Sequence, residues 1–138
     1  MASDRSNRIL RRAQGHDHAF RSEIKAVPGY VFDVTSADGT LIGTATVLIT
    51  HDFTDIARIG HIGTEVEPPF RKQGYAARMG RGLLPFLRDH GVRQALLTCD
   101  VGHESQAQSY REVGGIDLDV LPPLAPDQRA KARFVVML

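Results

Sequence analysis

Residues 71–80, RKQGYAARMG, combine residue types that suit the binding of a phosphate group. They follow a strand-like run and lead into apolar residues with helical spacing. The first backbone N–H groups of a helix have no acceptor within it, so these groups and the helix dipole favour an anion there. Gly74 and Ala76 leave the backbone accessible, and Arg71 and Lys72 add positive charge. The alternative is an ordinary turn into a helix.

Two other phosphate-binding motifs do not fit this segment. Its glycines match neither the dinucleotide fingerprint G-x-G-x-x-G nor the P-loop G-x-x-x-x-G-K-S/T. The sequence therefore disfavours a nicotinamide-dependent dehydrogenase and an NTPase.

The elements that position this turn follow from periodicity and from turn residues. The predicted order is β-β-β-α-β-α-β-β, an α/β fold whose first three strands form an antiparallel meander. We expect strands at 30–36, 40–50 and 57–67, a helix at 76–91, a strand at 93–100, a helix at 104–113, and strands at 116–121 and 132–138.

The N-terminal region is predicted to differ from the rest. Residues 1–18 are polar and basic without an apolar period, and we expect a mobile tail. A single domain over residues 19–138 would follow, beginning with a short helix at 19–27. His16, Asp17 and His18 could hold a metal ion, but solvated tail residues are the better interpretation, and we predict no metal site.

Composition narrows the function classes. A chain of 138 residues suits one domain, and 17 basic against 16 acidic residues lack the excess of a nucleic-acid binder. No segment has the apolar length of a signal peptide or a membrane helix, and the single Cys99 fits a reducing compartment. We therefore expect a cytoplasmic protein without nucleic-acid or membrane partners.

Two segments together resemble a known family. VEPPFRKQGYAARM is similar to the pyrophosphate-binding motif R/Q-x-x-G-x-G/A of the GCN5-related N-acetyltransferases (GNAT), with Arg71, Gly74 and Ala76 at its fixed places. HESQAQSYREVGG resembles the family's second signature, N-x-x-A-x-x-L-Y-x-x-x-G-F, with Tyr110 and Gly114 at matching places. The order of elements also agrees. The resemblance covers about residues 29–138 and implies a mixed, mostly antiparallel central sheet flanked by helices, with a shortened N-terminal region.

The resemblance implies that acetyl-CoA is the acyl donor. Its pyrophosphate would bind the turn, and its pantetheine arm would pair with backbone of the third strand, as an added strand would. His103 takes the place of the family's usual Asn, and Gln106 the place of its usual Ala. The predicted cofactor-binding residues are Thr64, Glu65, Val66, Arg71, Lys72, Gln73, Gly74, Tyr75, Ala76, Ala77 and His103.

Three residues are candidates for catalysis. Tyr110 would give its proton to the departing thiolate, because a phenol with a pKa near 10 is protonated at neutral pH; the alternative is a packing aromatic. His61 and Glu65, on one face of the third strand by period-two counting, are candidate bases for the incoming amine, or else satisfied polar residues of the sheet. Cys99 lies in the apolar run ALLTCD and is expected to be inert.

The predicted function is transfer of acetyl to a primary amine of unknown identity by direct attack. One alternative is a sensor or regulatory module that binds acyl-CoA without turnover, which the short N-terminal region and His103 make plausible. Another is an adaptor that recruits a partner through its basic tail. We also expect a homodimer, because an exposed last strand ending in FVVML invites pairing across a two-fold axis.

Overall fold

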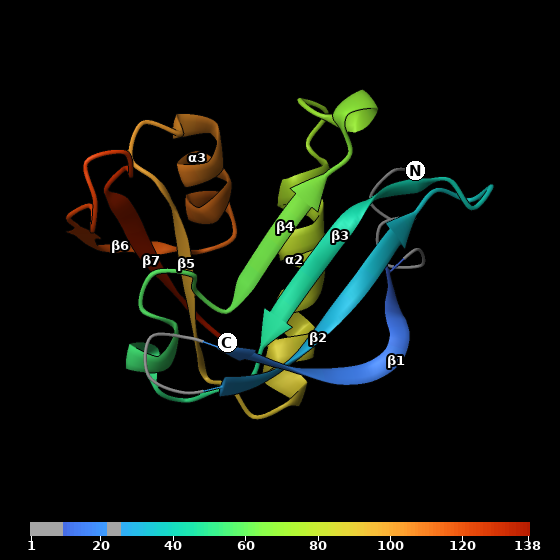
Figure 1. Ribbon diagram of the computed structural model, residues 1–138, viewed down its shortest axis with the longest axis horizontal. Coiled ribbons are helices and arrows are strands. Elements are labelled where there is room, and N and C mark those ends of the chain that lie inside the picture. Colours follow the sequence, from blue (N-terminus) through green and yellow to red (C-terminus); the bar gives the residue numbers. More distant parts are fainter. Residues whose placement is uncertain (1–9, 22–25) are drawn as a thin grey trace.

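The protein is seen here in a computed structural model that describes residues 10–21 and 26–138 (Figure 1). Two antiparallel sheets form its framework, with strand orders β1-β2-β3-β4 and β5-β7-β6. The first sheet consists of β1 (Leu10–Arg21), β2 (Ala26–Thr35), β3 (Leu41–Leu48) and β4 (Ile62–Val66). The second consists of β5 (Gln94–Asp100), β6 (Ile116–Leu121) and β7 (Lys131–Met137).

Two α-helices and two 3₁₀ turns complete the described chain. Helix α2 (Tyr75–Asp89) packs behind β3 and β4, and α3 (Glu104–Glu112) lies beside β5 and β7 (Figure 1). The 3₁₀ turns are η1 (Phe53–Ile56) and η2 (Pro68–Phe70). The α/β class and the order of elements from residue 30 onward are confirmed. The predicted third strand was too long, because residues 57–61 form a turn before β4 begins.

The N-terminal prediction was wrong where the structure describes it. Residues 10–21 form β1, which pairs antiparallel with β2 and has an irregularity between Arg12 and Asp17. The expected helix at 19–27 has strand residues at both ends, while residues 22–25 lie outside the described part. The prediction missed β1 because its sequence is polar, and an edge strand can carry polar side chains without an apolar period.

The core lies between the first sheet, α2 and the second sheet. Met79, Leu83 and Leu87 form the buried stripe of α2, as the 3.6-residue period requires. They belong to one apolar cluster with Phe32 of β2 and Phe134 of β7. Both sheets are therefore anchored to the same core.

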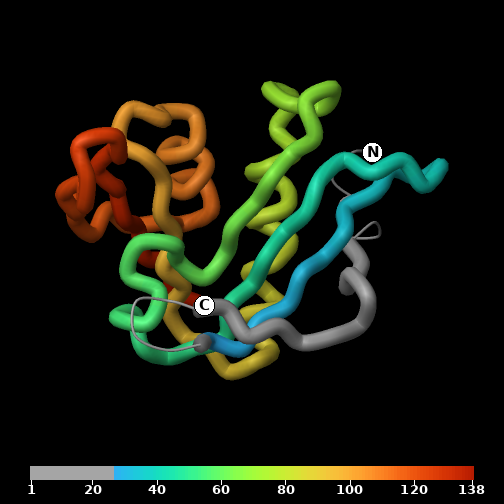
Figure 2. The backbone as a smooth tube through the Cα atoms, in the orientation of Figure 1, coloured from blue at the N-terminus to red at the C-terminus, as the bar shows by residue number. Residues whose placement is uncertain are grey.

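The two sheets meet at one end and diverge at the other (Figure 1). Where they meet, the His61 N–H donates to Leu96 O and the Leu96 N–H donates to His61 Nδ1, both at 2.8 Å. Beyond this point β4 and β5 belong to separate sheets. Figure 2 shows the chain path, with residues 62–66 and 94–100 spreading apart toward the ends of α2 and α3 that face one another.

The last strand is not an edge strand, contrary to the expectation on which the predicted dimer was based. β7 lies between β5 and β6 and pairs with β5 over residues 131–137 and with β6 over residues 131–135. Among the described residues, the outer edge of this sheet is β6 instead, where Ile116, Leu118 and Val120 are 63%, 47% and 58% exposed.

Candidate active site

A cleft of about 740 Å³ opens where the two sheets diverge. One wall consists of Thr64 and Val66 of β4 and of residues from 70–77, where α2 begins. The opposite wall consists of His103 and of the side of α3 that carries Ser105, Gln106 and Ser109. A smaller space of about 20 Å³ lies deeper, shares Thr64, Ala76, Ala77, Gln106 and Ser109 with the cleft, and reaches Tyr110.

The outer end of the cleft has the geometry of an anion site. Gly74 caps α2 in the left-handed region, with φ of 82°, and a side chain at this position would meet nothing within 4 Å. Gly74 offers no side-chain acceptor, and Arg78 is the first residue whose N–H reaches back to Gly74 O, at 3.2 Å. The N–H groups of Tyr75, Ala76 and Ala77 therefore have no acceptor within the helix. The sequence had predicted this feature.

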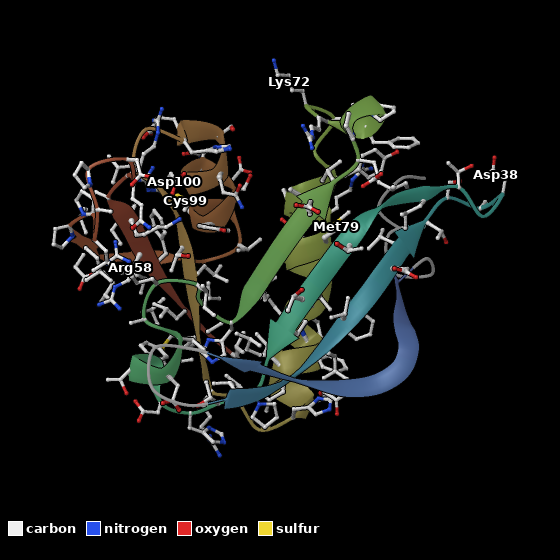
Figure 3. The ribbon with its side chains drawn as sticks, in the orientation of Figure 1. Asp38, Arg58, Lys72, Met79, Cys99 and Asp100 are labelled. Carbon is white, nitrogen blue, oxygen red and sulfur yellow. The ribbon has the colours of Figure 1, made fainter. Side chains whose placement is uncertain are left out.

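The turn before α2 is held by side chains that the sequence had assigned to cofactor binding. Arg71 Nε donates to Val66 O at 2.9 Å, and Gln73 Nε2 donates to Pro69 O at 3.1 Å. Gln73 therefore braces the turn and does not line the cleft. Lys72 has a positive φ of 63° and its side chain extends from the tip of the turn into solvent (Figure 3).

Arg78 holds the same turn from inside the helix. Its guanidinium lies 4.2 Å from the centre of the Tyr75 ring, and one terminal nitrogen donates to Gln73 O at 3.3 Å. These contacts make Arg78 a support for the turn.

The cleft side of β4 offers backbone groups for pairing. Leu48 N–H donates to His61 O and Glu67 N–H donates to Ile42 O, each at 2.8 Å. Antiparallel bonding uses alternate residues, so the backbone of Glu65 faces β3 and that of Thr64 faces the cleft. Of the three residues predicted to pair with a pantetheine arm, Thr64 and Val66 are suitably placed and Glu65 is not.

Tyr110 lies at the inner end of the site, on α3. Its hydroxyl donates to Thr98 O of β5 at 2.8 Å and accepts from Gln106 Nε2, also at 2.8 Å. Burial raises the pKa of Tyr110 to about 12, although the Gln106 bond opposes the rise. Tyr110 is therefore a protonated phenol at neutral pH, which is the state that proton donation requires.

The sequence matches the family model for the acetyltransferase (GNAT) family over residues 5–114. The chain belongs to this family. No curated protein matches the sequence significantly.

Several solved GNAT structures share the fold at low sequence identity. Spermidine N-acetyltransferase from Vibrio cholerae, solved with CoA and spermine, superposes with a TM-score of 0.65 at 18% identity, covering 79% of this chain and 65% of that one. RimL, a ribosomal L7/L12 alpha-N-protein acetyltransferase in complex with CoA, gives 0.63 at 13% identity and covers 80% and 62%. The microcin C7 self-immunity acetyltransferase MccE, solved with acetyl-CoA and AMP, gives 0.62 at 15% identity and covers 80% and 61%.

The GNAT chains in these structures are longer than this one. Our chain spans about 61–65% of their length. At these identities the likeness establishes the fold, while the ligands named above are those of the other proteins.

Most of the residues predicted to bind the cofactor in the GNAT fold do surround the cleft. They are Thr64, Val66, Arg71, Lys72, Gly74, Tyr75, Ala76, Ala77 and His103. His103 caps α3, and its Nδ1 accepts from the Gln106 backbone N–H at 3.3 Å. Its Nε2 is the nitrogen that remains for a ligand in the cleft, in the place where the family motif has Asn.

His61 is not placed to act as a base. Its side chain is fully buried, at 0% exposed, and both ring nitrogens have partners. Nε2 donates to Thr50 O at 2.9 Å, and Nδ1 accepts from Leu96 N–H. Burial also lowers the pKa of His61, so the ring is neutral and contributes to the junction between the sheets. The satisfied polar residue, the alternative interpretation of the sequence, is the one that the structure supports.

Glu65 points away from the cleft. It is exposed and shares a face of β4 with Gly63, whereas Thr64 and Val66 face the cleft. The Glu65 carboxylate can therefore approach a group bound in the cleft only from the opposite face of β4.

Cys99 is buried, as its apolar neighbours predicted. The thiol is buried in β5, and burial raises its pKa above the ordinary value. Within residues 10–21 and 26–138, no group of three or more metal-ligating side chains comes together, and no helix is long and apolar enough to cross a membrane.

The sequence missed Gln106 and Thr98 as parts of the site. Gln106 was noted only as a departure from the motif, although its place four residues before Tyr110 puts the two on one face of a helix. Thr98 contributes a backbone carbonyl, which any residue would supply, so its side chain carried no signal.

Proposed function

We propose that this protein is an acetyl-CoA-dependent N-acetyltransferase that transfers acetyl to a primary amine by direct attack. The observation that carries the proposal is the arrangement of the cleft. One end has the free N–H groups of α2 beside Gly74 and Arg71, and the other has the protonated hydroxyl of Tyr110. An elongated molecule with phosphate at one end and a thioester at the other suits this arrangement.

The described residues fit the parts of acetyl-CoA. The N–H groups of residues 75–77 and the charge of Arg71 would hold the pyrophosphate. Thr64 and Val66 would pair with the pantetheine arm, and His103 Nε2 would donate a hydrogen bond to it. Because Val66 O already accepts from Arg71 Nε, its N–H is the group left for pairing.

The reaction exchanges a C–S bond for a C–N bond. The amine nitrogen attacks the thioester carbonyl carbon, the carbon–sulfur bond breaks, and the thiolate takes the proton of Tyr110 Oη. The amine nitrogen loses a proton to a base. Of the two predicted bases, His61 is buried with both ring nitrogens bonded and Glu65 points away from the cleft, so solvent, or Glu65 acting from the opposite face of β4, would receive this proton.

The acceptor is a primary amine, either a small molecule or a group on a protein. Of the solved structures named above, one is a spermidine N-acetyltransferase, which acts on a small molecule, and one is a ribosomal-protein N-acetyltransferase, which acts on a protein. The short chain leaves both classes open.

Titration calorimetry with acetyl-CoA and dephospho-CoA tests the proposal, followed by an amine screen for CoA release. We expect saturable binding by the unmutated protein and its loss in an Arg71→Glu, Gly74→Asp variant. The matched control is Arg88→Glu, Gly39→Asp, because Arg88 lies exposed at the far end of α2 and Gly39 also has a positive φ with open space around it. Equal binding by both variants would show that the turn does not bind phosphate.

Two observations favour a second function, a sensor that binds acyl-CoA without turnover. The Tyr110 proton is directed at Thr98 O and not into the cleft, and His61 is unavailable as a base. An unmutated protein that binds acetyl-CoA and releases no CoA with any amine would support the sensor.

A homodimer formed along β6 is part of the proposal. The outer edge of this strand has no strand partner among the described residues, and its apolar side chains Ile116, Leu118 and Val120 are exposed. A second copy pairing across a two-fold axis would extend the sheet. Light scattering should give twice the chain mass, and Leu118→Lys should return it to that of one chain. A monomeric unmutated protein would contradict the dimer.

We further propose a cytoplasmic location. The single, buried Cys99 and the proposed use of acetyl-CoA support it.

A further inference from the structure

We propose that Gln106 is a positioning residue that fixes the Tyr110 hydroxyl and stabilises the phenolate left after proton donation to the CoA thiolate. The inference rests on the proposed acetyltransferase function and adds a residue to its proton-transfer step.

The hydrogen-bond geometry around Tyr110 Oη is specific. Gln106 and Tyr110 lie four residues apart on α3 and therefore on one face of the helix. Gln106 Nε2 donates to Oη at 2.8 Å, while Oη donates to Thr98 O at 2.8 Å. The phenol oxygen thus contacts both α3 and β5, with one lone pair left for other groups.

The two bonds respond differently when the proton moves. The bond to Thr98 O uses the hydroxyl hydrogen, so it must break when that hydrogen turns toward sulfur. The bond from Gln106 uses a lone pair of the oxygen and persists throughout. It becomes stronger once the oxygen is charged, because hydrogen bonds to ionised groups are roughly twice as strong as neutral ones.

Burial makes the Tyr110 hydroxyl a weaker acid, and the bond from Gln106 counteracts this effect. It raises the pKa of Tyr110 to about 12, and the Gln106 bond is the interaction that opposes the rise. A phenol that is too weak an acid delivers its proton slowly, since the efficiency of a general acid depends on its acidity. Gln106 therefore shifts Tyr110 toward the acidity that the leaving group requires.

The side chain of Gln106 bonds to Tyr110 instead of making the capping bond that is usual at its position in a helix. Gln106 is the third residue of α3, where a glutamine commonly reaches back to the N–H of the N-cap residue. Here the His103 N–H donates to Asp100 O at 3.1 Å, and Gln106 turns inward to Tyr110. It lines both the cleft and the deeper space next to Tyr110. An alanine, usual in the family motif, could not make this bond.

The test compares Gln106→Met with Gln108→Met. Methionine keeps the length and the helix propensity of glutamine but cannot donate. Gln108 is exposed on the same helix and lines none of the spaces described above, so it is the matched control. Both variants are prepared with fluorotyrosine at the three tyrosines, and the Tyr110 fluorine signal is assigned by its loss in Tyr110→Phe. Fluorine also makes phenols more acidic, which brings the titration to lower pH.

Three quantities are measured for each variant. We expect the midpoint of the Tyr110 fluorine titration to rise by about one pH unit in Gln106→Met, as the loss of a hydrogen bond to a charged group implies. We expect kcat to fall by up to about tenfold, the equivalent of one pH unit of acidity. The affinity of Gln106→Met for acetyl-CoA should equal that of the unmutated protein. Gln108→Met should match the unmutated protein in all three quantities.

The outcomes separate this proposal from the proposed function. An unchanged midpoint in Gln106→Met would overturn the role of Gln106 even if the enzyme is active. A raised midpoint with unchanged kcat would overturn its part in catalysis. A raised midpoint in a protein that acetylates no amine would overturn the acetyltransferase function itself, and with it any catalytic role for Gln106.

Discussion

His61 and Leu96 are joined by two hydrogen bonds of 2.8 Å, one made by the His61 backbone and one by its ring. The pair links the first sheet to β5 at the point where the two sheets begin to diverge. A third bond, from His61 Nε2 to Thr50 O, fixes the ring as a neutral tautomer that donates from Nε2 and accepts at Nδ1. The junction from which the cleft opens thus contains a histidine that cannot accept a proton at Nδ1 without losing its bond from Leu96 N–H.

This pair predicts a pH dependence of stability. Burial lowers the pKa of His61 in the folded protein below its ordinary value of 6.5. The unfolded chain therefore binds this proton more readily, so the stabilisation is complete above pH 6.5 and decreases as the pH falls below it. We expect a loss of up to about 1.4 kcal/mol per pH unit from this residue, measured by urea denaturation.

His61→Gln should remove this dependence and leave a less stable protein. His51→Gln is the comparison variant: His51 is exposed nearby and its charge is the smallest of the causes that lower the pKa of His61, so the slope should change only slightly. A slope that survives in His61→Gln would show that another group is responsible.

Gly43 is predicted to be essential for the packing of β3 on β4. A Cβ at this position would clash with Glu65 O and lie 3.0 Å from Met79 Cε of α2. We expect Gly43→Ala to destabilise the fold by about 3 kcal/mol, a fall of roughly 10 °C in Tm. Gly63→Ala is the matched control, since a Cβ there meets nothing within 4 Å. Equal Tm values for the two variants would contradict the packing described.

Tyr110→Phe should separate catalysis from binding. It removes the proton donor, so kcat should fall by at least about a hundredfold while the Kd for acetyl-CoA is unchanged. Stability should also fall, by about 1–3 kcal/mol, because Thr98 O loses its donor. Tyr75→Phe should retain activity, because its ring contacts with Phe70 and Arg78 do not need the hydroxyl. An active Tyr110→Phe enzyme would exclude Tyr110 as the acid.

Cys99 is predicted to react slowly with thiol reagents in the folded protein. Burial raises its pKa, so little thiolate is present at neutral pH, and the rate should increase only as the solution becomes alkaline. The chain has one cysteine, so the whole thiol signal reports this site. Rapid labelling of the folded protein, or loss of activity in Cys99→Ala, would contradict this prediction and support catalysis by Cys99.

The sequence predicted the parts of the site that depend on local chemistry. The turn at Gly74 and the tyrosine of α3 have fixed spacings within one segment, so they could be recognised without a structure. His61 could not be assigned, because its two partners, Thr50 and Leu96, come from other segments. Strand β1 was not predicted for a related reason, because its pairing with β2 is not encoded in an apolar period of its own.

The order of strands in the second sheet has a consequence for biosynthesis. Among the described residues, β5 and β6 both pair with β7 and not with one another, although β7 follows both in the chain. Neither strand has its partner until residues 131–137 have left the ribosome. The half of the cleft that contains Thr98 and Tyr110 therefore assembles only after these residues emerge, when the meander of β2, β3 and β4 is already available.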